Sequence, residues 1–380
     1  MLLDVSRYEA DRKERGERLR TAASFREPDR VPVCFGIGGS YYCWLFGYRI
    51  HEYYATPELQ PEVQLKGIEW QYEELRADNS TRASLGYEAG PVGEAVVFGA
   101  EVTWPEDTSP RIEHMVHTAA DIEKLTIPDP ATNPRLKDYF RNYAKFNDTA
   151  RKMGVKLALN DHPAIGIHPP LSCACALMSP TKVYEMMYTE PELLRRFLDK
   201  CWEAFCVYSD YFDQLYGRPR TRGGVGLCDD NISQISAEMF RTFEMPYYLE
   251  LRDRHQATAF YLHTDGPNDQ HFKTLADEVK ITSMDIGGYS SLATAVRDMK
   301  GKVHIHGGLR CWDFYAAGKM TAETRSKVIA AIRLAAPGGG FELAIGGETY
   351  VGVSREGICD LVRFVKQWGR YPIDIPDDAE

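Results

Sequence analysis

Residues 259–266 read AFYLHTDG, an apolar run that ends in an imidazole and a carboxylate group. Two other mainly apolar runs are also followed by acidic residues: residues 223–231 read GGVGLCDDN, and residues 341–348 read FELAIGGE. Short apolar runs bounded by glycine and acidic residues predict strands. In an α/β barrel the polar groups that follow the strands line the active site, so we expect the chemistry at these three strand ends.

Strand-like runs alternate along the chain with longer helical patterns, an arrangement that produces a parallel sheet covered by helices. Strands are predicted at residues 31–35, 155–160, 223–228, 259–263, 281–286, 303–305 and 341–345. An eighth is expected among the less regular segments. This pattern favours an α/β fold, a single (β/α)8 TIM barrel with N-terminal additions, in which residues 1–380 form one domain.

The composition is that of an ordinary water-soluble chain, with 380 residues that are 44% hydrophobic and 26% charged. A net charge of −10 argues against bulk electrostatic binding of nucleic acid or anionic lipid. No apolar run reaches the roughly 18 residues of a membrane span, and residues 1–20 lack the apolar core of a signal peptide. The nine cysteines, without a CxxC pair, are typical of a reducing compartment. We therefore expect a cytoplasmic protein.

Polar residues that follow the predicted strands are the candidate site residues: Asn160, Asp161, His162, Asp229, Asp230, His263, Asp265, Asp285, His306 and Glu348. His263 and Asp265 would point the same way if their strand continued, and Glu348 could then complete a metal site suited to zinc. A structural interpretation is also open. In it Asp265 caps a turn before Gly266, and His263 donates to a backbone carbonyl.

Asp229 and Asp230 are adjacent carboxylates that suit acid–base work, because repulsion between neighbouring charges raises one pKa. Adjacent strand residues face opposite ways, so we expect one of the two to be functional. His304 and His306 share one side of their predicted strand. Of these two, only His306 is near enough to the strand end to serve a site, and a purely structural role is equally open.

Longer motifs accompany these residues. They are residues 122–129 (IEKLTIPD), the block from Cys228-Asp229-Asp230 through 236–240 (SAEMF) to 245–248 (MPYY), the turn at 263–266, the segment 339–341 that opens the last strand, and the less specific segment 29–33 (DRVPV). Together they resemble the uroporphyrinogen decarboxylase superfamily over residues 28–372. The resemblance implies a TIM barrel. Members of this superfamily catalyse at least two kinds of reaction, so the resemblance alone does not fix the reaction.

The porphyrinogen decarboxylases of that superfamily carry an Arg-Gln-Ala-Gly-Arg segment whose arginines pair with substrate carboxylates. The corresponding residues 36–42 (GIGGSYY) contain no arginine, and a buried tetrapyrrole with many carboxylates needs cationic partners. The other branch resembles zinc-dependent methyltransferases that use a separate corrinoid protein. The His-x-Cys pair and later cysteine of its coenzyme M members fall on His263, on Asp265 and near Gly347 or Glu348, so the thiolate ligands are missing.

Nitrogen and carboxylate ligands make a metal a harder Lewis acid, suited to polarising an ether oxygen. The resemblance therefore implies a zinc methyltransferase of the O-demethylation type, which moves a methyl group from a methyl ether to the cob(I)alamin of a partner corrinoid protein. A methoxylated aromatic compound is one such donor, and a homo-oligomer is compatible with this function. The implied roles are zinc binding by His263, Asp265 and Glu348, catalysis by Asp229 and Asp265, and substrate binding by Tyr41, Tyr42, His162 and His306.

Two rival hypotheses remain from the sequence. One is a metal-free decarboxylase or related lyase that uses Asp229 or Asp230 as an acid. The other is a barrel without catalytic activity that binds a corrinoid protein.

Overall fold

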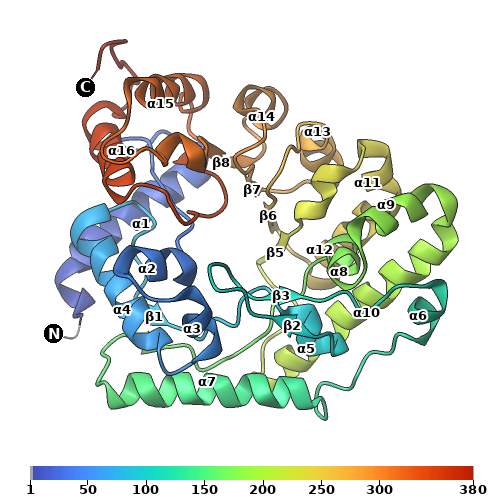
Figure 1. The fold of residues 1–380 in the computed structure, drawn as a ribbon. Coiled ribbons are helices and arrows are strands. Elements are labelled where there is room, and N and C mark those ends of the chain that lie inside the picture. Colours follow the sequence, from blue (N-terminus) through green and yellow to red (C-terminus); the bar gives the residue numbers. More distant parts are fainter. Residues whose placement is uncertain (1–2, 380) are drawn as a thin grey trace.

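The computed structural model describes residues 3–379, in which strand–helix units build a parallel sheet at the centre of the molecule (Figure 1). Five strands follow one another in sequence order, and each pairs in parallel with the next. They are β5 (Gly224–Cys228), β6 (Ala259–His263), β7 (Ser283–Asp285), β8 (His304–Gly308) and β9 (Phe341–Ala344). The strands predicted in this half of the chain are therefore confirmed, with shifted ends.

Cross-strand register sorts the side chains of this sheet into rows. One row consists of buried apolar side chains, Leu227, Leu262, Met284, Ile305 and Phe341. The next row is polar and consists of Cys228, His263, Asp285, His306 and Glu342. Because successive residues of a strand point to opposite faces, the apolar row packs on one face while the polar row lies on the other. The register thus gathers polar groups from all five strands.

The first half of the chain departs from the predicted strands. Residues 31–35 form a single isolated bridge, which joins Val33 to Leu343 of β9. The side chains of Asp78 and Asn79 take the place of a neighbouring backbone here. Val33 N donates to Asp78 Oδ2 at 2.8 Å, and Phe35 N donates to Asn79 Oδ1 at 3.1 Å. A regular ladder is therefore interrupted, and the strand prediction for residues 31–35 is wrong.

The remaining strands are short. β1 (Ser84–Leu85) pairs in parallel with β4 (Ala158–Leu159), and β2 (Val102–Thr103) pairs antiparallel with β3 (Arg111–Ile112). Within residues 3–379 no strand pairing joins β4 to β5, so hydrogen bonds between strands do not close the ring. The closed barrel predicted from the sequence is accordingly corrected to an α/β fold with a parallel sheet.

Helices surround the sheet on its outer side, and the long helix α7 runs along one edge of the molecule (Figure 1). No helix of the described residues is both long and apolar enough to cross a bilayer. The helices are α1 (Glu9–Ala23), α2 (Gly39–Phe46), α3 (Ile50–Ala55), α4 (Gln60–Trp70), α5 (Gly93–Phe98), α6 (Ala119–Lys124), α7 (Pro134–Lys152), α8 (Pro170–Leu177), α9 (Pro180–Thr189), α10 (Pro191–Leu215), α11 (Ala237–Phe243), α12 (Met245–His255), α13 (Phe272–Thr274), α14 (Leu292–Met299), α15 (Ala322–Ala335) and α16 (Arg355–Trp368).

A buried ionic network ties the N-terminal helix to the sheet. Asp78 is 1% exposed and accepts hydrogen bonds from Arg18 of α1 at 2.8 Å and from Arg30 at 2.7 and 2.8 Å. Both guanidinium groups are also buried. Asp78 is therefore a shared counter-charge that offsets part of the desolvation cost of burying two arginines.

Candidate metal and substrate site

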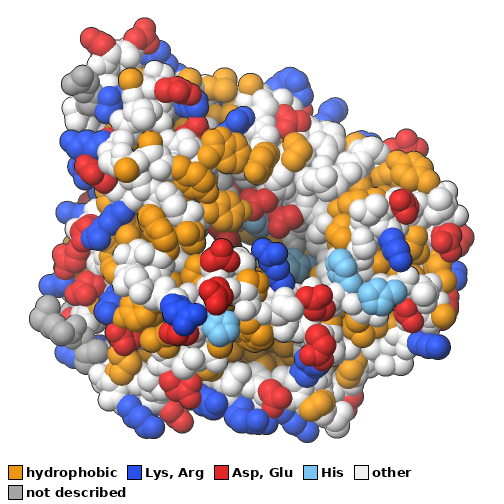
Figure 2. All heavy atoms as spheres, viewed as in Figure 1, with side chains coloured by type: hydrophobic (Ala, Val, Ile, Leu, Met, Phe, Trp, Pro, Cys, Tyr) orange, Lys and Arg blue, Asp and Glu red, His pale blue; other side chains and the backbone are white. Residues whose placement is uncertain are grey.

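A cavity of about 840 Å³ lies at the carboxyl ends of β5 and β6, a volume within the range of small-molecule sites. Figure 2 shows a hollow in the middle of this face, with acidic and histidine side chains inside it. The ionisable and aromatic lining consists of Tyr41, Tyr54, Tyr87, Tyr139, Tyr350, Glu88, Asp230, Asp265, Glu348, His168, His263 and Cys228. No arginine or lysine among residues 3–379 lines it. Such a cavity suits a neutral ligand or a cation better than a polyanion.

His263 ends β6 and lies between carboxylates from two neighbouring strands. Its Nδ1 is 3.3 Å from Asp285 Oδ2, and its Nε2 is 3.8 Å from Asp230 Oδ1. Burial lowers the pKa of His263, but the hydrogen bond to Asp285 and the surrounding carboxylates outweigh burial and raise that pKa to about 9. The ring is thus held at one nitrogen by Asp285, and the other nitrogen faces Asp230.

The backbone at Gly347 forms one wall against this imidazole. A Cβ atom added at Gly347 would lie 2.2 Å from His263 Cε1 and 2.8 Å from Asp265 Oδ1. No side chain fits in that space, so the position has to be glycine while His263 and Asp265 keep their places. Glu348, the next residue, is the carboxylate that the last strand end contributes to the cavity.

Asp265 connects the acidic groups on the cavity floor. Its backbone N donates to Asp230 Oδ1 at 2.6 Å, and Tyr350 donates its hydroxyl proton to Asp265 Oδ2 at 2.7 Å. Burial raises the pKa of Asp265, and burial together with the Asp265 charge raises the pKa of Glu348. Asp230, His263 and Asp265 each offer a ligand atom, and these atoms lie within 4.8 Å of one another. The structure therefore groups two of the three predicted zinc ligands with Asp230.

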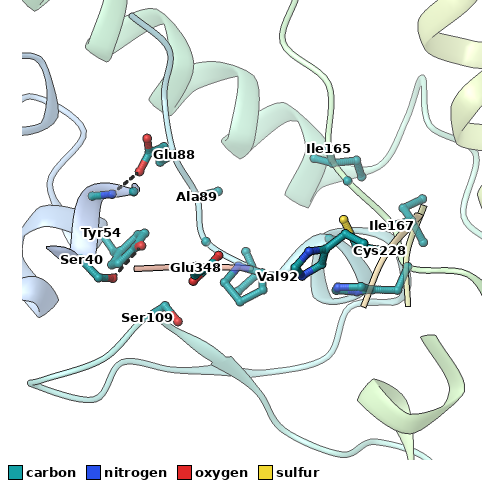
Figure 3. A pocket seen from close by; sticks show the side chains of 18 of the residues that line it. Ser40, Tyr54, Glu88, Ala89, Val92, Ser109, Ile165, Ile167, Cys228 and Glu348 are labelled. Carbon is teal, nitrogen blue, oxygen red and sulfur yellow. Dashed lines mark hydrogen bonds between the residues drawn. The ribbon is translucent and has the colours of Figure 1, made fainter. Parts of the chain in front are cut away.

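Glu348, the third predicted ligand, lines the same cavity without belonging to that closest group. Figure 3 shows its carboxylate among other lining side chains, including Ser40, Tyr54 and Val92. Ser40 and Tyr54 are hydrogen-bonded through their hydroxyl groups at 3.1 Å.

Asp229 is fully buried and does not line the cavity. Ser172 donates to its Oδ1 at 2.5 Å and Tyr248 to its Oδ2 at 2.8 Å, while the neighbouring Glu244 accepts from Leu171 N at 3.1 Å. Burial raises the pKa of Asp229 to about 6 and that of Glu244 well above its ordinary value. The hydrogen bond between the two carboxyl groups lowers the pKa of Asp229 and raises that of Glu244, so Glu244 is the carboxyl group that keeps its proton more strongly. Of the adjacent pair, it is Asp230 that faces the cavity.

The structure brings one of the four predicted substrate-binding residues to the cavity. Tyr41 lines it, whereas Tyr42, His162 and His306 do not. Tyr41 and Tyr42 belong to helix α2, in which successive side chains point about 100° apart, so they cannot share a wall. His162 is exposed and packs edge-on against Tyr216. His306 lies in the polar row of the sheet, beside Glu342.

His168 is a site residue that the sequence patterns did not single out. Its Nδ1 lies 2.8 Å from Glu94 Oε1, and its backbone N donates to the same oxygen at 2.7 Å. Burial lowers the pKa of His168, but the fully buried Glu94 outweighs it and raises the pKa to about 9. The histidine stands just before Pro169-Pro170 at the start of α8, which is the one local signal for it. Glu94 gives no such signal, because it comes from α5.

The fold and the site define an α/β protein with an acidic, tyrosine-lined cavity at the carboxyl ends of parallel strands. The chain belongs to the uroporphyrinogen decarboxylase (URO-D) family, whose sequence model matches residues 14–368. A curated uroporphyrinogen decarboxylase from Trichodesmium erythraeum (strain IMS101) is 30% identical over 90 residues, which are 23% of this chain and 24% of that protein. The match thus spans about a quarter of the curated relative.

Among solved structures, a chain described as a methyltransferase from Methanosarcina mazei has a similar fold, with a TM-score of 0.63. The superposition covers 92% of this chain and 97% of that chain, at 18% sequence identity. At this identity the similarity is evidence of a shared fold.

Proposed function

We propose that this protein is a metal-dependent methyltransferase that moves a methyl group from a methyl ether, such as a methoxylated arene, to the cob(I)alamin of a partner corrinoid protein. The observation that carries the proposal is the group formed by Asp230, His263 and Asp265, whose ligand atoms lie within 4.8 Å of one another in the cavity. The similarity of the fold to that of a methyltransferase supports it.

The donor set of this group fits a divalent cation of the zinc type. An imidazole nitrogen and carboxylate oxygens are ordinary zinc ligands. Asp285 at Nδ1 leaves Nε2 of His263 facing Asp230, which is the arrangement that metal-binding histidines usually have with a supporting carboxylate. When bound, zinc would supply Lewis-acid polarisation of the ether oxygen. Because the ligands are mostly oxygen atoms and include no thiolate, they favour polarisation of an ether oxygen over activation of a thiol.

The side chains around the group have roles in binding and orientation. Tyr350 fixes Asp265 through its hydroxyl, and burial raises the pKa of Tyr350, so the phenol stays protonated and keeps donating to Asp265. Tyr41, Tyr54 and Tyr87 offer aromatic surface to a methoxylated ring. Glu348 is placed to complete the ligand set or to orient the donor.

The lining argues against a porphyrinogen substrate. A buried polycarboxylate needs cationic partners, and no arginine or lysine in the described part of the chain lines the cavity. A neutral methyl ether carries no such requirement.

A metal-free lyase acting on a smaller acid is the second candidate. It is favoured by the two cavity imidazoles, His168 and His263, whose pKa values are each raised to about 9 and which are therefore cations at neutral pH. Two imidazolium groups could hold one carboxylate group. Release of carbon dioxide by metal-stripped protein, without corrinoid, would support this candidate and exclude the first.

The test is anaerobic incubation with a corrinoid protein and a panel of methoxyarenes, followed through the absorption change from cob(I)alamin to methylcobalamin. His263→Ala and Asp265→Asn should each lower the methylation rate by at least about 100-fold, because loss of a metal ligand removes several kcal/mol of stabilisation. His162→Ala is the matched control, since that histidine is exposed and outside the cavity. No methylation by the wild-type protein, combined with binding of the corrinoid protein, would instead support a binding role without catalysis.

A further inference from the structure

A second group of metal-ligand side chains lies in the polar row of the sheet, away from the cavity lining. It consists of His304 and His306 on β8 and Glu342 on the neighbouring β9. His306 Nδ1 is 3.1 Å from Glu342 Oε2, and His304 Nε2 is 3.4 Å from Glu342 Oε1. The two imidazole rings lie 4.4 Å apart between centroids. The three residues thus converge on one point inside the sheet.

The hydrogen bonds available to this group do not satisfy it. His304 is 4% exposed and Glu342 is 6% exposed, so neither reaches bulk water. His304 Nε2 and His306 Nε2 are both buried without a hydrogen-bond partner among the described residues. Leaving a buried polar atom without a hydrogen bond destabilises the folded state. A buried ion pair between His306 Nδ1 and Glu342 alone would leave His304 Nε2, which faces the same carboxylate, without a hydrogen bond.

The spacing agrees with the ligand shell of a small cation. Ligands about 2.0–2.1 Å from a tetrahedral zinc ion lie roughly 3.3 Å from each other, close to the 3.4 Å between His304 Nε2 and Glu342 Oε1. All three residues offer a ligand atom within 4.8 Å of the others. The Cys34 thiol, also buried, hydrogen-bonds to the Glu342 carboxylate and is adjacent as a further ligand.

We propose that His304, His306 and Glu342 bind a second divalent transition-metal ion, of the class that accepts two imidazoles and a carboxylate, such as Zn²⁺. No residue of this site belongs to the group of Asp230, His263 and Asp265. The site does not depend on the proposed methyl transfer. In the sheet, His306 of β8 is the register neighbour of Asp285 of β7. A metal ion at this site would therefore be a structural support for β7, whose Asp285 contacts His263.

Metal content of the dialysed full-length protein, measured by inductively coupled plasma mass spectrometry after loading with Zn²⁺, tests the proposal. We expect two equivalents in the wild type. Glu342→Gln, which keeps the side-chain shape, should retain one equivalent, and Asp265→Asn should retain the other. Addition of Co²⁺ to the metal-free Asp265→Asn protein should give tetrahedral d–d bands that the Asp265→Asn/Glu342→Gln double variant loses. A thiolate charge-transfer band that Cys34→Ser removes would place the sulfur in the ligand shell.

The outcomes separate this site from the proposed function. One equivalent that Glu342→Gln abolishes and Asp265→Asn leaves intact would support the second site and refute zinc binding in the cavity. One equivalent that only Asp265→Asn abolishes would overturn the second site and leave a buried ion pair. Should Glu342→Gln fail to fold, a zinc-edge anomalous difference map from wild-type crystals decides, because the absence of a peak between His304, His306 and Glu342 overturns the proposal.

Discussion

Replacement of Asp285 by asparagine should weaken zinc binding at His263 while the shape of the site is kept. Asp285 Oδ1 accepts from Gly287 N at 3.0 Å, and an amide oxygen can keep that bond. The new NH₂ group then stands where Oδ2 faced His263 Nδ1 at 3.3 Å. Two donors cannot pair, so Nδ1 gives up its proton and accepts from the amide. The remaining proton moves to Nε2, which then cannot bind a metal.

The size of the effect follows from the lost bond. If Nε2 is to bind the metal in the variant, the charge-assisted hydrogen bond at Nδ1 is forfeited, which costs about 1.5–3 kcal/mol. At about 1.4 kcal/mol per factor of ten, this loss predicts a dissociation constant for zinc that is roughly 10- to 100-fold higher. Asp285→Ala removes the acceptor without imposing the wrong tautomer, so it should lose less zinc affinity than Asp285→Asn.

The loss of zinc affinity in Asp285→Asn should also depend on pH. The pKa of His263 is about 9 in the metal-free protein, so protons compete with zinc at pH 7. Without the Asp285 charge this pKa falls, and the competition falls with it, which offsets part of the loss. The difference between wild type and Asp285→Asn should therefore be larger at pH 9 than at pH 7.

Competition with a fluorescent zinc chelator, carried out on metal-free wild type and on both variants at the two pH values, measures these affinities. Equal zinc affinity of Asp285→Asn and wild type at pH 9 would refute the tautomer argument. So would an alanine variant that binds zinc less tightly than the asparagine variant.

Three further changes test the packing and the buried charges. Glu244→Gln should flatten the pH dependence of stability: the pKa of Glu244 in the folded protein lies well above its ordinary 4.5, so wild-type stability is greatest below that value and declines as the pH rises toward the folded pKa. Urea unfolding at pH 5 and pH 8 should show a smaller decline in the variant, and equal declines would contradict a raised pKa of Glu244 in the folded protein. Gly347→Ala should displace His263 and abolish the zinc equivalent bound in the cavity, as measured in the chelator assay, whereas Gly166→Ala, which has open space for a Cβ atom, should bind zinc normally; normal binding by both would show that the backbone at position 347 can shift to admit a side chain. Asp78→Ala should lower the free energy of unfolding by about 3–5 kcal/mol in denaturant titrations, because the buried Arg30 loses its carboxylate partner and Arg18 keeps only Asp29 and Glu14; a loss below about 1 kcal/mol would mean that water reaches the Arg30 guanidinium.

The five strands of the sheet were predictable because each lies in or beside a short run rich in apolar residues that ends at glycine or polar residues, and hydrophobic patterning is a local signal. Residues 31–35 have the same pattern, yet they do not form a regular strand. Side chains of Asp78 and Asn79 occupy the hydrogen-bonding positions of a neighbouring backbone. These hydrogen bonds join residues 31–35 to residues that lie far away in the sequence. The local pattern of residues 31–35 therefore cannot reveal them.

By itself the sequence determined the residue types at the strand ends, the family, and His263 and Asp265 as neighbours, because each of these follows from local order along one chain segment. Only the tertiary structure decided which members of adjacent pairs face the cavity, namely Asp230 and Tyr41 instead of Asp229 and Tyr42. It also brought His168 against Glu94. The physical reason is that side-chain direction depends on strand register and helix rotation, which are set by the packing of the whole domain.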